Sequence, residues 1–289
     1  MPSSAAELVE RLGNMSIERA WSPYTSFDWP EALDPEAEYY MTPELMSLYG
    51  TESFESLSEA QRKRLSFHEI NNFFSFVLLG ERPVVGGMTE RMYRKDTMGP
   101  VTDYMHHFID EENKHMVMFS LFCNKYLGKI YPEKKVTIDR ELAPGEDDIV
   151  FYCRVLIVEE LGDVYNRRMM ADKNINELVR LINEYHHRDE ARHLSFGRAW
   201  AAELFERHSK NWTAEQLANF QSWLGKYFVS SWSDFYNPSV YRDAGLDNAY
   251  QLRLDAMSNP AQKAFRESAS AKLLKFFVKH GFLDEAPAL

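Results

Sequence analysis

The stretch "HHRDEARHLSFG", residues 186–197, places three imidazoles and two carboxylates within the first eight positions of an expected helix. It contains Glu190 and His193 in the spacing E-x-x-H, which puts a carboxylate and an imidazole one helical turn apart on the same face. A second copy, Glu112 and His115, lies upstream. This spacing suits a shared metal ion, but a single copy is common by chance, so each copy needs partners.

Each of the two copies has a glutamate 31 residues before it. Glu81, in "SFVLLGERPVV", stands before Glu112 at that distance, and Glu159, in "VLIVEELGDVY", stands before Glu190. An unpaired charge in such apolar runs is costly to bury. With a turn near residues 94–99, Glu81 and Glu112 each lie roughly 18–20 Å from the turn along their helices. Glu159 and Glu190 are likewise at equal distances from the next predicted turn. We therefore predict two antiparallel helix hairpins, in each of which one glutamate faces one E-x-x-H.

Four inward-facing helices with Glu, E-x-x-H, Glu and E-x-x-H are the ligand set of ferritin-like carboxylate bundles that hold two iron or manganese ions. Carboxylates and imidazoles suit these metals, and the scarcity of sulfur ligands argues against copper(I), an iron–sulfur cluster or structural zinc. A further imidazole, His186, shares the face of Glu190 within about a 60° arc. The matching position of the first hairpin is Phe108, which cannot bind a metal. The predicted metal ligands are Glu81, Glu112, His115, Glu159, His186, Glu190 and His193.

Two acidic residues directly precede the ligand glutamates of the E-x-x-H motifs. A metal-bound histidine usually donates its other N–H group to a carboxylate. We expect Glu111 to orient His193, and Asp189 to orient His115, each across to the opposite hairpin. An ordinary solvated surface charge is the alternative for both acidic residues.

Two neighbouring residues compete with the predicted ligands. Glu160 adjoins Glu159 and cannot share its face, so the choice of Glu159 depends on the repeat of 31 residues. His187 lies about 100° round the helix from His186. Its own E-x-x-H with Glu184 therefore points away from the predicted site.

Composition narrows the partners of the chain. It has 289 residues, 45% of them hydrophobic, and a formal net charge of −11 without a dense basic run, which argues against nucleic acid and favours a small molecule. The two cysteines, Cys123 and Cys153, lack a CxxC spacing, so a reducing compartment, the cytoplasm, is expected. The N-terminus does not resemble a signal peptide, and the most apolar stretch, 73–85, is too short to span a bilayer. No membrane association is expected.

Helical periodicity dominates from residue 58 onward, and we predict an all-α protein. Ser58 is a suitable N-cap with Gln61 three positions later. Residues 1–57 carry scattered prolines and are predicted to be an irregular segment that wraps the body, anchored by Trp21, Tyr24, Phe27 and Trp29. Residues 58–289 are predicted to form a ferritin-like helical di-metal domain with additional flanking helices, so that a single domain overall is expected. Long helices are predicted at 58–93, 100–127, 147–170, 173–207 and 213–236, with a shorter one near 260–279.

Taken together, these residues resemble the p-aminobenzoate N-oxygenase family of non-heme di-iron oxygenases, the AurF-like arylamine oxygenases of the ferritin-like superfamily. The resemblance rests on the seven predicted ligands and covers about residues 58–207, and His186 is the family's distinguishing mark. It implies a homodimer and two Fe ions, with a manganese–iron pair not excluded. The chain is somewhat shorter than the best-known arylamine oxygenases, and no residue in it is recognisable as the one that binds the carboxylate or nitro end of a substrate.

The expected chemistry is O₂ activation. Two Fe(II) ions would reduce O₂ to a peroxo-bridged di-iron(III) species, which transfers an oxygen atom to an amine nitrogen or a C–H bond of a small substrate. Two electrons per turnover imply an external ferredoxin or reductase, because no GxGxxG fingerprint for a flavin or nicotinamide occurs. The alternatives are a desaturase or oxidase acting on an aliphatic or acyl chain, a ferroxidase or iron-storage protein, and a metal-free helical interaction module in which the repeat is accidental.

Overall fold

The structure is a computed structural model that describes residues 5–95, 97–132, 138 and 140–289. Within these residues the regular secondary structure is helical and no strand forms, apart from an isolated bridge between Tyr39 and Ile175. This confirms the predicted all-α class. No helix of the described chain is both long and apolar enough to cross a membrane.

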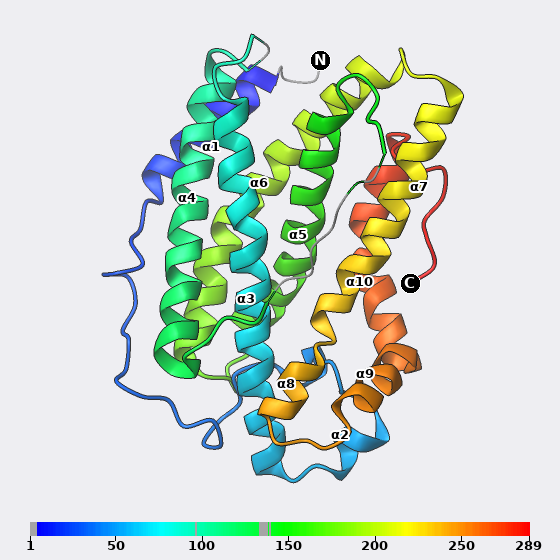
Figure 1. Ribbon diagram of the computed structural model, residues 1–289. Helices are drawn as coiled ribbons and strands as arrows, with labels where there is room; N and C mark the ends of the chain where they lie inside the picture. Colours follow the sequence, from blue (N-terminus) through cyan, green and yellow to red (C-terminus); the bar gives the residue numbers. More distant parts are fainter. Residues whose placement is uncertain (1–4, 96, 133–137, 139) are drawn as a thin grey trace.

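Two helix hairpins form the core of the molecule (Figure 1). The first pairs α3 (Glu59–Arg91) with α4 (Pro100–Phe122), and the second pairs α5 (Glu146–Ala171) with α6 (Glu177–Ser209). Together they make the ferritin-like four-helix bundle that the sequence predicted. The end of α4 continues into a π-helical turn over Cys123–Leu127.

Local sequence sets where the core helices begin. Ser58 accepts a hydrogen bond from the backbone N–H of Gln61, whose side chain accepts one from the backbone of Ser58, so both ends of the expected capping box are present. Asn176 caps α6 by accepting a hydrogen bond from the N–H of Val179. These caps fix where α3 and α6 begin.

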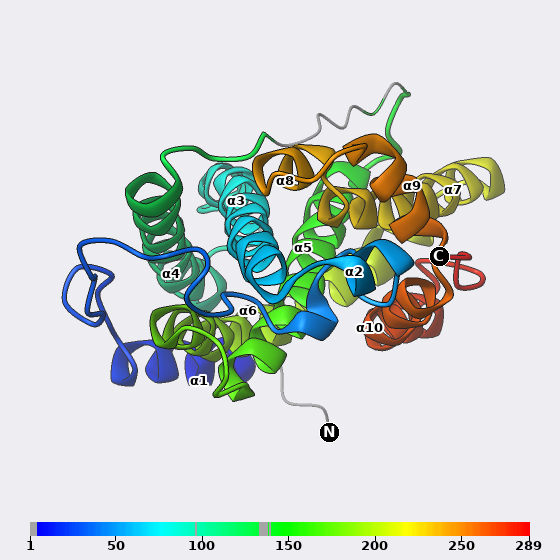
Figure 2. The same cartoon turned by 90° about the horizontal axis from the view of Figure 1, so that it is seen from below.

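The predicted irregular N-terminal segment is corrected by the structure over its first part. Residues Ala5–Glu18 form α1, which packs against α4 and α6 on one side of the core (Figure 2). Val9 and Leu12 are buried and Ser16 follows at the same helical spacing, whereas the prolines begin later in the segment. A 3-10 turn at Pro43–Leu45 and the short α2 (Glu52–Ser56) are the other regular elements of this segment.

The anchoring aromatics of this segment divide into two kinds. Phe27 is buried, and Trp21 and Trp29 are half-buried against the hydrophobic core. Tyr24 is 69% exposed, so its predicted role as an anchor is wrong.

The C-terminal helices cover the opposite side of the core (Figures 1 and 2). Helices α7 (Ala214–Ser231) and α10 (Pro260–Lys279) contact α5, and α8 (Pro238–Asp243) contacts α3. The 3-10 turn Trp232–Phe235 follows α7, and α9 (Ala249–Ser258) precedes α10. The four-helix core is thus covered by α1 on one side and by the C-terminal helices on the other.

Candidate metal centre

The structure places all seven predicted ligands inside the four-helix core. Helix α3 contributes one of them, α4 two, α5 one and α6 three. None of the seven side chains is more than 2% exposed. They are Glu81, Glu112, His115, Glu159, His186, Glu190 and His193, and we call them the central cluster.

One group of four donors lies between α3, α4 and α6. His186 Nε2 is 3.0 Å from Glu190 Oε1 and 3.3 Å from Glu81 Oε1. His115 Nδ1 is 3.5 Å from Glu81 Oε1 and 3.4 Å from Glu190 Oε1. The four side chains thus offer ligand atoms within 4.8 Å of one another.

A second group of donors overlaps with the first. His193 Nδ1 lies 2.8 Å from Glu112 Oε1 and 3.4 Å from Glu190 Oε1. His115 also belongs to this group, so that His115 and Glu190 are common to both. The arrangement therefore offers two adjacent positions to cations.

Glu159 lies outside these two compact groups but faces the same centre. Its carboxyl contacts that of Glu190, and burial together with the charges of Glu190 and Glu112 raises the pKa of Glu159 well above its ordinary value. Glu160 is equally buried but turns away to form ion pairs with Arg198 and, at 3.3 Å, with Lys272. Of the two neighbouring glutamates, Glu159 is the one oriented toward the cluster.

The inward-facing atoms of the central cluster make no hydrogen bonds within the described part of the chain. These atoms are both carboxylate oxygens of Glu81, Glu112, Glu159 and Glu190, Nδ1 of His115 and His193, and Nε2 of His186. Buried polar atoms are normally paired, because an unpaired one loses its hydration without compensation. A convergent set of such donors fits two bound hard metal ions.

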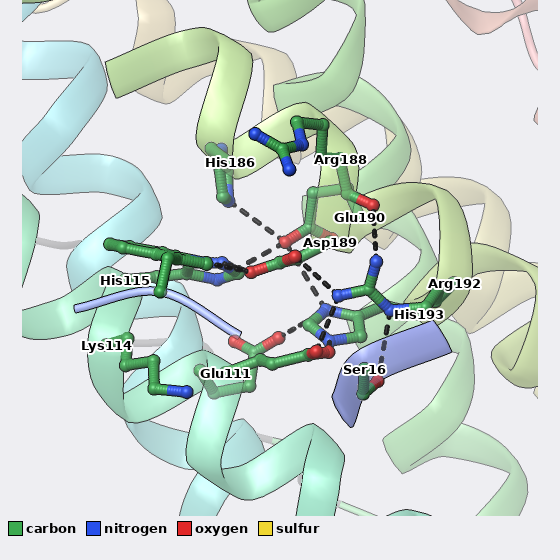
Figure 3. A network of polar contacts seen from close by, with 12 residues as sticks. Ser16, Glu111, Lys114, His115, His186, Arg188, Asp189, Glu190, Arg192 and His193 are labelled. Atoms are coloured by element: carbon green, nitrogen blue, oxygen red, sulfur yellow. Dashed lines mark hydrogen bonds and ion pairs between the residues drawn. The ribbon is translucent and has the colours of Figure 1, made fainter. Parts of the chain in front are cut away.

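The outward-facing nitrogens of two histidines are held by carboxylates (Figure 3). His193 Nε2 lies 2.9 Å from Glu111 Oε2, and His115 Nε2 lies 3.2 Å from Asp189 Oδ2. Each contact joins α4 to α6, from one hairpin to the other. Both carboxylates thus lie behind the histidine that the sequence paired with them, and both are buried.

Arg192 links these two carboxylates (Figure 3). Its Nη2 donates at 2.5 Å to Glu111 Oε1 and at 2.5 Å to Asp189 Oδ1, and the side chain is fully buried. Burial alone would raise the pKa of each carboxyl, but the neighbouring histidine and Arg192 outweigh it and lower the pKa of both. The histidine in front of each carboxylate and the shared guanidinium therefore hold Glu111 and Asp189 ionised.

The N-terminal segment closes this network from outside. Arg192 Nε donates to Ser16 Oγ of α1 at 3.1 Å. Trp21 Nε1 donates to Asp189 Oδ2 at 2.7 Å, and the indole stacks on the His115 ring with centroids 6.0 Å apart. Trp21 was predicted only as an anchor of the N-terminal segment, and Ser16 and Arg192 were not predicted. Only Arg192 carried a signal, because it lies one turn after Asp189.

His186 has a partner of a different kind, which the sequence analysis also missed. The amide of Asn166 on α5 lies 2.7 Å from His186 Nδ1, while Asn166 Oδ1 has no partner among the described residues. Exchanging the amide oxygen and nitrogen lets His186 Nδ1–H donate to Oδ1 and satisfies both atoms. The Nε2 atom then faces the carboxylates of Glu190 and Glu81. The signal was the position of Asn166 seven residues after Glu159, on the same helical face.

The two hairpins differ at one position in the cluster. Phe108, which matches His186 in the repeat, stacks on the His193 ring with centroids 3.8 Å apart. The first hairpin therefore has an apolar ring at the position where the second hairpin has the imidazole of His186. His187 is outside the cluster, and its Nδ1 lies 2.5 Å from Asp163 Oδ1.

The electrostatics of the cluster favour cations. Burial is the largest cause that raises the pKa of Glu112, to about 7. Burial would lower the pKa of His193, but Glu190 and Glu112 outweigh it and raise that pKa well above its ordinary value. Four carboxylates enclosed in a low-dielectric core thus attract positive charge, either as protons or as metal ions.

Comparisons with known proteins give relatives at low sequence identity. Uncharacterized proteins of Mycobacterium bovis and Mycobacterium tuberculosis are 23% identical over 235 residues, which cover 77% of this chain. The chain spans 66% of the length of these curated relatives. An R2-like ligand-binding oxidase without metal cofactor aligns with a TM-score of 0.46 at 16% identity, over 92% of this chain and 96% of that one. A variant of an R2-like ligand-binding oxidase with an aerobically reconstituted Mn/Fe cofactor aligns with a TM-score of 0.44 at 15% identity, over 93% and 94%.

A family model gives the decisive match. The model described as P-aminobenzoate N-oxygenase AurF matches residues 2–281. The match includes the whole central cluster and extends well beyond the 58–207 span of the resemblance, into the N-terminal segment and the C-terminal helices. Because it covers nearly the entire sequence, the chain belongs to the P-aminobenzoate N-oxygenase AurF family.

Proposed function

We propose that this chain is an O₂-dependent non-heme dimetal monooxygenase that oxygenates a small organic substrate, at an amine nitrogen or at a C–H bond. Membership of the family supports an oxygenase. The observation that carries the proposal is the central cluster itself, in which the inward ligand atoms converge to within 2.8–3.5 Å without forming hydrogen bonds, while the outer nitrogen of each histidine is held. A plain structural polar network would instead pair its atoms internally.

The proposed cofactor is a pair of iron ions, with a manganese–iron pair not excluded. Glu81, His115 and His186 would hold one ion, and Glu112 and His193 the other. Glu190 lies between the two positions, and Glu159 is the remaining carboxylate that faces them. When bound, the ions supply the activation of O₂.

The chain's own residues prepare the site for these ions. Glu111, Asp189 and Asn166 orient the three histidines, so that the other ring nitrogen of each faces the cluster. Phe108 and Phe119 cover His193 and His186 with apolar rings. This packing excludes bulk water from one side of the cluster, which a reactive oxidant requires.

The reaction needs partners that the chain itself does not provide. One oxygen atom of O₂ enters the substrate and the other leaves as water, which consumes two electrons and two protons. We propose that an external ferredoxin or reductase supplies the electrons. A homodimer and a cytoplasmic location, both expected from the sequence, also stay predictions.

Metal analysis after anaerobic loading with Fe(II) tests the proposal. We expect about two iron ions per chain, as in other carboxylate bundles of this kind, and a loss of bound iron in Glu112→Ala and His193→Ala. Glu160→Gln is the matched control, because Glu160 is buried beside Glu159 but pairs with Arg198. Retention of both ions in the two alanine variants would contradict the assignment.

Product analysis tests the reaction class. The iron-loaded protein is mixed with O₂, an electron donor and panels of aryl amines, alkyl aromatics and acyl chains, and products are identified by mass. Addition of one oxygen atom from ¹⁸O₂ supports a monooxygenase. Loss of two hydrogens without oxygen incorporation identifies a desaturase, and accumulation of ferric mineral identifies a ferroxidase.

A further inference from the structure

A cavity of about 310 Å³ lies on the outer side of the seam between α3 and α5, beneath α7. This volume falls in the range of small-molecule sites. Its lining is mainly apolar and includes Phe76, Leu79, Val84, Val155, Val158 and Tyr227. It adjoins a second cavity of about 290 Å³, with which it shares Phe76, Leu79, Ser233 and Asp234. The second cavity also carries a cation, Arg253, whose Nε donates to the backbone carbonyl of Tyr236 at 2.9 Å.

The inner wall of this cavity adjoins the central cluster. Val84 lies one turn after Glu81 on α3, and Val155 lies one turn before Glu159 on α5. The helices α3 and α5 run in opposite directions (Figure 1), and Gly80 of α3 lies against Val158 of α5, so the two valines stand at about the same level of the seam. The valines line the cavity, and the two glutamates face the cluster on the other side. The cavity wall and two of the proposed metal ligands therefore lie on adjacent turns of the same two helices.

One positive charge lines the 310 Å³ cavity without a carboxylate partner among the described residues. Arg154 of α5 is half-buried in the lining, and its guanidinium lies 5.6 Å from the centroid of the Tyr227 ring. No carboxylate of the described chain pairs with it. Arg91, also partly buried against α5, instead pairs with Asp148 at 2.7 Å. The other charged side chain of the lining, Asp234, already has an interaction of its own.

We propose that this cavity is the substrate site and that Arg154 binds the carboxylate of an apolar monocarboxylate substrate. The apolar part of the substrate then lies along the valines of the seam and presents its reacting atom toward Glu81 and Glu159. A guanidinium in an apolar wall is an effective partner for a carboxylate, because its planar donors match the two oxygens and little water competes. The role as a substrate site rests on the proposed function, whereas the binding itself does not require metal.

Calorimetric titration of matched probes tests the role of Arg154. The probes are octanoate against octan-1-ol and 4-ethylbenzoate against 4-ethylbenzyl alcohol, each titrated into the metal-free and the iron-loaded protein. We expect the carboxylates to bind about tenfold tighter than the alcohols or more, and Arg154→Gln to abolish this preference. Arg188→Gln is the control, because Arg188 is also half-buried and lies 5.0 Å from the ring of Tyr185, outside the cavity. It should keep the preference.

A second variant tests the cavity rather than the charge. Ser230 is exposed at the α7 rim of the cavity, so Ser230→Trp fills the entrance without touching the core. We expect it to weaken the binding of the carboxylate and the alcohol alike, by about tenfold or more. Binding of octanoate that is unchanged in both variants, or preferential binding of octylammonium, would overturn the proposal.

The two proposals fail in different ways. If the metal-free protein binds carboxylates as described but takes up no iron, only the proposed function fails. If iron loads and O₂ is consumed while Arg154→Gln and Ser230→Trp bind the probes like the unaltered protein, only the substrate site fails. Cobalt(II) loading gives a further readout, because octanoate should shift the visible absorption of the loaded protein and octan-1-ol should shift it less.

Discussion

Each histidine of the central cluster has one ring nitrogen held from behind and one directed at the carboxylates. The holding groups differ, since Asp189 and Glu111 are ionised carboxylates and Asn166 is a neutral amide. A carboxylate increases the electron density of the imidazole that it accepts from, whereas an amide mainly orients the ring. His186 is therefore expected to be the weakest donor of the three histidines and the one most easily lost.

The pair His186 and His187 offers a test within one helical turn. His186→Gln should weaken the binding of one ion by about tenfold or more, because it removes an inward-facing donor. His187→Gln should leave both ions bound, since His187 contacts Asp163 outside the cluster. Titration with Co(II), followed by its visible absorption, measures both steps. Equal losses in the two variants would remove His186 from the ligand set.

Arg192 is expected to matter for stability as well as for the site. Arg192→Gln leaves Glu111 and Asp189 buried without their shared cation, which should lower the free energy of unfolding by about 3–5 kcal/mol. Urea denaturation at neutral pH measures this loss. Arg192→Lys keeps the positive charge but lacks the planar guanidinium group that reaches both carboxylates. Its stability should therefore lie between that of Arg192→Gln and that of the unaltered protein. Arg188→Gln, on the half-exposed face of the same helix, serves as the control.

At the scale of single residues, the sequence predicted which side chains form the central cluster, but not all of the residues that hydrogen-bond to them. The 31-residue repeat depends on helix geometry, which is local and regular, and it identified residues that the structure brings together. Asn166 and Arg192 lie on the same helices at helical spacings from cluster residues, so a longer search of those faces would have found them. Ser16 and Trp21 come from a distant segment, and no local rule predicts where that segment runs.

At the scale of helices, the seam between α3 and α5 depends on close approach. A Cβ at Gly80 would stand 2.7 Å from Val158 Cγ1, which is closer than packed carbon atoms come. Val158 is β-branched and has little rotamer freedom in a helix, so it cannot turn aside. The absence of a side chain at Gly80 therefore sets the distance between these helices, and with it the distance between Glu81 and Glu159.

Substituting glycine by alanine at two positions of α3 tests this seam. Gly80→Ala should lower the free energy of unfolding by about 1–3 kcal/mol, because the added methyl group overpacks the interface. Gly86→Ala meets nothing within 4 Å and is exposed, so it should raise stability by up to about 1 kcal/mol through helix propensity. Thermal or urea unfolding of the two variants gives the comparison. A Gly80→Ala variant that is more stable than the unaltered protein would contradict this account. It would show that α5 moves away from the added methyl group at no cost in free energy.

The long helices were predictable and the short ones were not. Each of the four core helices spans several turns, and the structure places their ends within a few residues of the predicted ones. Helices α8 and α9, between residues 237 and 259, were not predicted. A helix of one to three turns is only marginally stable in isolation, and it forms because it packs against the rest of the protein. The same reason explains why α1, in a segment rich in turn formers farther on, was mistaken for irregular chain.

At the scale of the whole molecule, one buried carboxylate joins three parts of the fold. Glu69 of α3 accepts a hydrogen bond from the backbone N–H of Ser47 at 3.2 Å and another from the hydroxyl of Ser47. That hydroxyl lies 2.7 Å from the hydroxyl of Tyr241 in α8. The N-terminal segment, the core and the C-terminal helices thus meet at a group that is 4% exposed. Burial raises the pKa of Glu69 to about 7, although the hydrogen bonds from Ser47 lower it.

This raised pKa makes the stability of the molecule depend on pH in a defined direction. The unfolded chain releases the proton of Glu69 near its ordinary pKa of 4.5, whereas the folded protein keeps it up to about pH 7. The contribution of this group to the free energy of unfolding therefore falls as pH rises from 4.5 to 7 and is constant above. Glu69→Gln removes the dependence, so its stability relative to the unaltered protein should increase by about 2–3 kcal/mol between pH 5 and pH 8. Urea unfolding at several pH values measures this difference. Ser47→Ala should extend the pH dependence of stability to higher pH, because it removes a hydrogen bond that favours the ionised form of Glu69. Parallel pH profiles of stability for Glu69→Gln and the unaltered protein would contradict the assignment of this dependence to Glu69.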